Sequence, residues 1–114
     1  MGQKDRCEIL ESDFQYDLIR EIKERFPGAI VLKNDAGYIQ GFPDLTILYR
    51  SCWAVLEVKK NIHASRQPNQ EYYVNLLNNM SFSDFICPEN KEEVLNELEQ
   101  TFGVGGHTRV SKSK

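Results

Sequence analysis

The sequence has few of the features that mark membrane, secreted or zinc-stabilised proteins. Its 114 residues contain no apolar run close to the roughly 18 residues that a membrane-spanning helix needs. Three cysteines, an odd number without a C-x-x-C pair, argue against a disulfide framework and a structural zinc site. The polar N-terminal residues lack the apolar segment of a secretory signal. We therefore expect a reduced, cytoplasmic domain without a membrane anchor.

A large excess of basic residues is also absent. The 14 Lys and Arg and the 17 Asp and Glu give a net charge of −3, which excludes a wholly basic protein that coats nucleic acid. A nuclease remains compatible, because metal-binding carboxylates themselves lower the net charge. With 40% hydrophobic and 27% charged residues, the chain has globular composition. We expect one domain over residues 8–102, between a flexible N-terminus (1–7) and a flexible basic tail (103–114).

Hydrophobic periodicity predicts a mixed α/β domain with the order α-β-β-β-α-β-α, in which helices flank a small mixed sheet. The expected helices cover residues 12–26, 68–80 and 91–102. The expected strands cover residues 29–33, 44–49, 53–59 and 82–87.

Local signals add detail at the helix ends and faces. Ser12 or Asp13 is expected to cap the first helix, and Asn90 with Glu93 has the spacing of a capping box at the last. The apolar face of the helix over 68–80 is expected to comprise Tyr73, Leu76, Leu77 and Met80.

The strands over 44–49 and 53–59 are separated by a tight connection and read as an antiparallel hairpin. Asp44 begins the first strand and Glu57 lies near the end of the second, so the hairpin makes them neighbours in space. Because side chains alternate along a strand, Glu57 and Lys59 share one face. Two carboxylates and one ammonium therefore converge at one end of the hairpin.

This combination suits a hard divalent cation such as Mg²⁺, for which Mn²⁺ would substitute. Mg²⁺ prefers oxygen ligands, and Asp44, Glu57 and the carbonyl of Val58 can supply three. Lys59 can orient or deprotonate a water molecule, or offset charge on a pentavalent phosphate. The alternative is structural: charged residues on strands also form solvated faces or cross-strand ion pairs.

Two residues on predicted helices favour the functional interpretation. Helical spacing puts Glu11 and Gln15 on the same stripe as Phe14 and Leu18, facing inward at the start of the first helix. Gln70 is in line with the apolar stripe of the second helix, near its start. The alternatives are a favourable interaction of Glu11 with the helix dipole and an ordinary first-turn role for Gln70.

Four motifs together resemble the PD-(D/E)XK nuclease superfamily, and more closely the virus-type replication–repair nuclease (VRR-NUC) domains of bacteriophages. They are Glu11-x-x-x-Gln15, Gly41-Phe-Pro-Asp44, Glu57-Val-Lys59 and Gln70. The resemblance covers residues 8–102 and implies a restriction-endonuclease-like fold and metal-dependent hydrolysis of phosphodiester bonds.

The resemblance also implies roles for individual residues. Asp44 and Glu57 would be metal ligands, Lys59 the catalytic lysine, Glu11 a further ligand or water-positioning residue, and Gln70 the site residue of the second helix. Stand-alone viral members resemble homodimeric, structure-selective endonucleases that act on branched DNA such as four-way (Holliday) junctions. This implies a phage-encoded enzyme in a bacterial cytoplasm, and the alternative is a non-catalytic DNA- or protein-binding module of the same fold.

Several polar residues are candidates for contacts with DNA phosphates, although simple solvation explains each equally well. The principal candidates are Lys33, Asn34, Lys60 and Arg66. His63 lies in a polar loop without a carboxylate partner in the sequence, so a general-base role is disfavoured. Tyr72 and Tyr73 are candidates for base stacking, but Tyr73 is better explained by packing.

Overall fold

The computed structural model describes residues 10–103, which form one α/β domain. The helices are α2 (Glu11–Arg25), α3 (Pro68–Met80) and α4 (Lys91–Phe102), with a short 3-10 turn, η1 (Pro88–Asn90), before α4. The strands are β1 (Ile30–Lys33), β2 (Leu45–Tyr49), β3 (Cys52–Val58) and β4 (Phe82–Ile86). The predicted order of helices and strands is confirmed, and every predicted bound coincides with the observed one or differs from it by one residue. The flexible segments predicted for 1–7 and beyond Gly103 lie outside the described residues.

The four strands form one mixed sheet in the order β1-β2-β3-β4. β1 pairs antiparallel with β2, and β2 pairs antiparallel with β3 through a two-residue turn, since Tyr49 is opposite Cys52. β4 lies parallel to β3, with α3 as the connection between them. The predicted hairpin is therefore confirmed, and it fixes which residues meet at the far end of β2 and β3.

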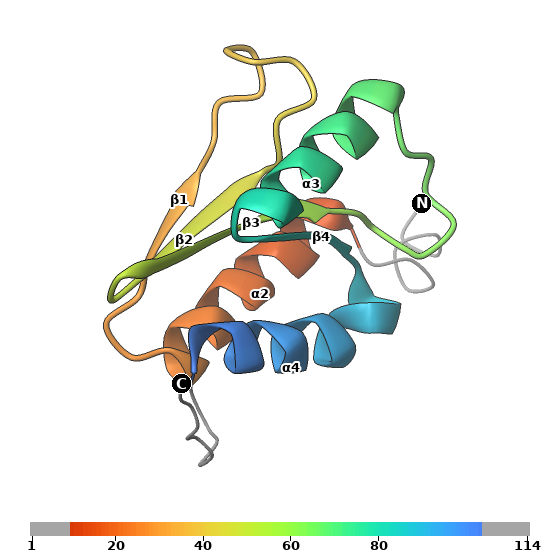
Figure 1. Ribbon diagram of the computed structural model, residues 1–114. Coiled ribbons are helices and arrows are strands. Elements are labelled where there is room, and N and C mark those ends of the chain that lie inside the picture. The colour runs from red at the N-terminus through yellow and green to blue at the C-terminus, as the bar shows by residue number, and fades with distance from the viewer. Residues whose placement is uncertain (1–9, 104–114) are drawn as a thin grey trace, which may run out of the picture.

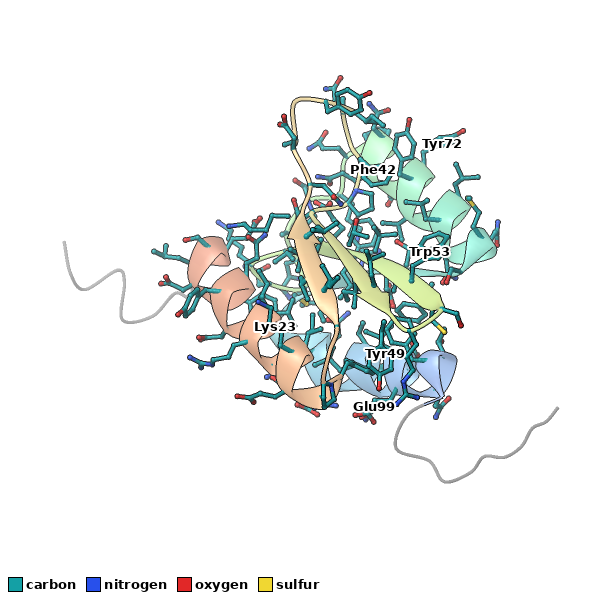
Figure 2. All side chains as sticks on the ribbon, turned by 90° about the vertical axis from the view of Figure 1, so that its left-hand side faces the viewer. Lys23, Phe42, Tyr49, Trp53, Tyr72 and Glu99 are labelled. Carbon is teal, nitrogen blue, oxygen red and sulfur yellow. The ribbon has the colours of Figure 1, made fainter. Side chains whose placement is uncertain are left out.

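Helices cover both faces of the sheet: α3 lies on one side, and α2 and α4 lie on the other (Figure 1). Alternation along the strands divides their side chains between the two layers, so that Trp53 lies on the α3 side and Tyr49 on the α4 side (Figure 2). The larger core lies between the sheet and α2 with α4, around Leu18, Ile22 and Leu56. β3 is buried on both faces, which explains its nearly continuous apolar sequence.

The predicted helix caps are wrong in their local detail. α2 begins at Glu11 after Leu10, so Ser12 and Asp13 lie inside its first turn, where acidic residues favour the helix dipole. Asn90 precedes α4 without capping it through its side chain. Its side-chain amide instead accepts from the Cys87 N–H and donates to the Phe85 carbonyl, because the 3-10 turn brings Asn90 back beside the end of β4.

The predicted buried face of α3 is also partly wrong. Val74 and Leu77 are the buried residues of this helix, whereas Leu76 and Met80 are 40% and 64% exposed. The reason is that α3 packs over β3 and β4 and leaves one apolar flank uncovered.

No helix in the stretch from 10 to 103 is both long enough and apolar enough to cross a membrane. Both cysteines in this stretch, Cys52 and Cys87, are free thiols.

Candidate active site

The hairpin brings Asp44 and Glu57 together, as the sequence predicted. Leu45 is opposite Leu56, so the next step along the register puts Asp44 beside Glu57. The Asp44 carboxylate accepts a hydrogen bond of 2.8 Å from the Val58 N–H. The Asp44 carbonyl accepts one of 2.7 Å from the Asn34 N–H, which prolongs the pairing of β1 with β2. Asp44 is therefore held by both neighbouring segments at one end of the sheet.

Glu57 is one of two buried polar residues among those described, with only 4% of its surface exposed. It points to the α3 side of the sheet, because its neighbours Leu56 and Val58 belong to the larger core on the other side. The Gln70 side chain donates from Nε2 to Glu57 Oε2 at 3.0 Å. A buried carboxylate thus has a specific partner, as buried polar groups require.

Lys59 and Gln70 complete a three-residue network with Glu57. Lys59 Nζ donates to Gln70 Oε1 at 2.8 Å and lies 3.9 Å from Glu57 Oε2. Gln70 Oε1 also accepts from the Gln67 N–H at the start of α3. The Gln70 amide therefore bridges the Glu57 carboxylate and the Lys59 ammonium group. Its contact with the Gln67 N–H fixes its position at the first turn of α3. The prediction that Gln70 faces the sheet is confirmed.

Burial perturbs the acid–base properties of this cluster. Desolvation, reinforced by the charge of Asp44, raises the pKa of Glu57 to about 8. Desolvation also raises the pKa of Asp44, although hydrogen bonding from Val58 and the charge of Lys59 oppose the rise. A cluster of carboxylates with raised pKa values is electrostatically suited to a cation, which would favour their charged forms.

Glu11 lies at the first position of α2 and is more exposed than its predicted inward orientation implied. The site nevertheless affects its carboxylate. Partial burial and the charge of Asp44 raise the pKa of Glu11, and the charges of Lys59 and Lys60 oppose this rise without cancelling it. Gln15, one turn further along α2, is half-buried. The structure thus brings Glu11 to the edge of the cluster rather than into its buried part.

The oxygen ligands available here are few, and they fit a hard cation that keeps several of its water molecules. Within residues 10–103, no three His, Cys, Asp or Glu side chains are close enough to share one ion. Mg²⁺ commonly uses one or two carboxylates and keeps several waters, so the pair Asp44 and Glu57 meets its needs. Continuing the register puts Val58 opposite Pro43, which has no N–H to donate to the Val58 carbonyl. On the side of the Asp44 carboxylate, the Val58 carbonyl therefore receives no backbone hydrogen bond from β2.

Comparison with solved structures finds a similar fold in a protein described as a VRR_NUC domain. The two chains superpose with a TM-score of 0.55 at 24% identity, over 74% of this chain and 92% of the other. The fold is that of a VRR_NUC domain. No family model and no curated protein matches the sequence. The expected PD-(D/E)XK-like core is therefore confirmed by structure, at a level of identity that speaks to fold alone.

Candidate DNA-contacting residues lie around this VRR_NUC-like core in different settings. Lys33 is exposed at the end of β1, and Lys60 is exposed just after β3, where its charge lowers the pKa of Glu11 against the raising effect of burial. The Asn34 amide is engaged within the fold, since it donates to the Pro43 carbonyl and to Thr46 Oγ1. The Arg66 guanidinium lies 4.0 Å from the centre of the Phe85 ring and is thereby held against the α3 face of the sheet.

His63 is exposed, and its N–H bonds to the Asn61 side chain within the loop. Tyr72 is 60% exposed, whereas Tyr73 packs against Phe42 with ring centres 5.6 Å apart, as its packing role predicted. The Phe42 side chain lies between its loop and α3 (Figure 2). Sequence reasoning missed this contact between loop and helix, although the Gly41-Phe-Pro run before Asp44 was a signal of a constrained segment.

Proposed function

We propose that this protein is a metal-dependent endodeoxyribonuclease that hydrolyses phosphodiester bonds. The observation that carries the proposal is the buried network of Glu57, Lys59 and Gln70 beside Asp44, at one end of a VRR_NUC-like sheet. Buried ionisable groups with specific partners and perturbed pKa values are typical of active sites. An ordinary cross-strand ion pair does not require a glutamine bridge from a helix.

Each residue has a role that its position supports. Asp44, Glu57 and the Val58 carbonyl would hold Mg²⁺ or Mn²⁺, with Glu11 at the edge as a further ligand or water-positioning group. When bound, the cation would lower the pKa of water and offset charge on the phosphate. Lys59 donates to Gln70 and carries positive charge into the site, where it can stabilise charge that develops on the phosphate. Gln70 holds the Lys59 and Glu57 side chains in fixed positions relative to each other through its two hydrogen bonds.

We further propose that the substrate is branched DNA, such as a four-way junction, and that two copies act together. Paired cuts across a junction require two active sites, which a dimer supplies. The exposed Lys33 and Lys60 would attract the DNA backbone toward the carboxylate end of the sheet.

An uncovered apolar surface supports the homodimer. Ile30, Leu32 and Leu48 lie on the α3 face of β1 and β2 and are 39–55% exposed. On α3, Leu76 and Met80 share a stripe with Tyr73, which faces the neighbouring loop through Phe42. These five exposed residues therefore border the same side of the sheet. Exposed apolar patches of this kind favour association with another protein surface.

Cleavage of labelled four-way junction, flap, duplex and single-stranded DNA tests the proposal. We expect cutting with Mg²⁺ or Mn²⁺ and none with EDTA. Asp44→Ala, Glu57→Ala and Lys59→Ala should each abolish cutting while the far-ultraviolet circular dichroism spectrum stays native. Matched control changes at exposed residues, Glu97→Ala and Lys23→Ala, should leave it intact.

The outcomes separate the alternatives. Wild-type-like cutting by any two of the three site variants would refute the assignment of the active site. Tight junction binding without any cutting would favour the non-catalytic binding module of the same fold.

The mass of the protein in solution tests the dimer. Light scattering after gel filtration should give twice the chain mass for the wild type. The exposed-residue change Leu48→Lys should give a monomer with native circular dichroism, because it puts a charge into the apolar surface. A monomeric wild type at all concentrations tested would refute the homodimer without touching the nuclease assignment.

A further inference from the structure

The loop over residues 34–43, between β1 and β2, lies beside the start of α3 and is anchored there (Figure 1). Gly41 has a φ of +88°, and a Cβ built on it would lie 2.4 Å from the Asn69 Cβ. Only glycine fits this close approach. The tilted ring contact between Phe42 and Tyr73 adds a second anchor, so the loop is held against α3 at two points.

Residues of the loop line an open hollow of about 370 Å³. Its lining combines aromatic and aliphatic side chains with a polar edge: Asn34, Asp35, Tyr38, Ile39 and Phe42. Tyr38 is 84% exposed, the most exposed of the large hydrophobic residues described, although an aromatic ring gains most from burial. Neither the core nor the carboxylate cluster uses this ring.

The hollow is linked to the candidate active site by hydrogen bonds to the backbone of Asp44 and Pro43. Asn34, which lines it, donates from its N–H to the Asp44 carbonyl and from Nδ2 to the Pro43 carbonyl. The same loop also forms a separate cleft with the start of α3, and Gln70 is among the residues that line it. The segment that lines the hollow is therefore hydrogen-bonded directly to the chain that carries Asp44 into the carboxylate cluster.

We propose that this hollow binds an unpaired nucleobase of the DNA substrate, stacked on Tyr38. The inference rests on the proposed nuclease function and adds a source of structure selectivity. Every nucleobase has a flat π-face that stacks on aromatic side chains without regard to sequence. In duplex DNA both faces of a base are already stacked, so a base at a branch or single-stranded end enters at far lower cost. The polar edge at Asn34 and Asp35 suits the hydrogen-bonding edge of a base.

Binding measured in EDTA, where we expect no cutting, tests the proposal with the full chain. Two labelled DNAs of one sequence are compared: a flap with 2-aminopurine at the first unpaired position, and its fully paired counterpart. Tyr38→Ala should weaken flap binding roughly five- to hundredfold, the range that loss of one base–aromatic stack gives. Duplex binding should stay within about twofold, and the quenching of 2-aminopurine fluorescence should disappear.

Two further variants provide controls. Tyr38→Phe retains the ring and should bind like the wild type, which separates stacking from any role of the hydroxyl group. Tyr16→Ala removes a tyrosine that is 69% exposed on α2, and should change nothing. An equal loss of flap and duplex binding in Tyr38→Ala, or no loss of either, would overturn the proposal.

Two outcomes distinguish this inference from the function on which it rests. If the wild type cuts DNA while Tyr38→Ala binds the flap normally, the nucleobase site is refuted and the nuclease stands. If the wild type neither cuts nor binds any DNA, both are refuted. A change in the mass of Tyr38→Ala in solution would assign the hollow to a protein contact and overturn the nucleobase site.

Discussion

Replacing Glu57 with glutamine should make the metal-free protein more stable, and increasingly so as the pH rises. Glutamine keeps the shape of the side chain and an oxygen that can accept from Gln70 Nε2, which lies 3.0 Å from the present carboxylate. It removes only the ionisation of a residue that is 4% exposed. The unfolding free energies of Glu57→Gln and the wild type therefore isolate the cost of a buried negative charge.

The magnitude follows from the linkage between proton binding and folding. Burial raises the pKa of Glu57 from 4.5 to about 8, so between these values the folded chain holds a proton that the unfolded chain has lost. The unfolding free energy of the wild type must then fall as the pH rises through this window. At 1.36 kcal/mol for each pH unit, this residue accounts for about 3 kcal/mol between pH 4 and pH 7.

Urea denaturation in EDTA at half-unit steps from pH 5 to pH 8.5 measures this difference. We expect the advantage of Glu57→Gln over the wild type to grow with pH and to level off near pH 8. The variant should keep a shallower slope of its own, because the pKa values of Asp44 and Glu11 are also raised. Exposed Glu97→Gln is the matched control and should run parallel to the wild type. Parallel curves for Glu57→Gln and the wild type would refute a buried, destabilising carboxylate at this position.

Three other predictions concern the cation, the loop and the sheet. Millimolar Mg²⁺ or Mn²⁺ should raise the melting temperature of the wild type but not of Asp44→Asn, since only the native state presents the ligands; equal shifts in both would remove Asp44 from the site. Gly41→Ala should destabilise the fold by about 1–3 kcal/mol in urea, because its φ is +88° and its Cβ would collide with Asn69; an unchanged midpoint would show that the loop is not anchored there. Ser83→Ala should stabilise the fold by about 1 kcal/mol, because Ser83 Oγ is buried without a hydrogen-bond partner in the described structure; a loss of stability would reveal a partner for the hydroxyl group.

The carboxylate end of the site was predictable because a tight hairpin leaves little freedom. The predicted strands bring Asp44 to the end of the second strand, and the observed two-residue turn, which places Cys52 in β3, sets the register that puts Asp44 beside Glu57. Helical periodicity similarly predicted which face of α3 carries Gln70. In both cases a strictly local rule, the alternation of a strand or the turn of a helix, determines the position of the side chain.

Features that depend on how separate elements pack were not predictable from the sequence. The bridge from Gln70 to both Lys59 and Glu57 requires the placement of α3 over β3. The same placement leaves Leu76 and Met80 exposed, although their spacing is that of a buried stripe. Periodicity reports which residues share a face and does not report whether another element covers that face.

The buried carboxylate at Glu57 is costly to the fold, and that cost is the strongest physical reason to expect a cation there. A purely structural role is met equally well by glutamine, which keeps a hydrogen bond to Gln70 without a charge to desolvate. A carboxylate with a pKa of about 8 becomes useful when a positive ion shares its burial, because the ion then stabilises the charge that water no longer solvates. The stability gained in Glu57→Gln and the cation response lost in Asp44→Asn are thus linked expectations. If glutamine stabilised the protein and Mg²⁺ still failed to stabilise the wild type, the buried charge would have to be offset by Lys59 alone.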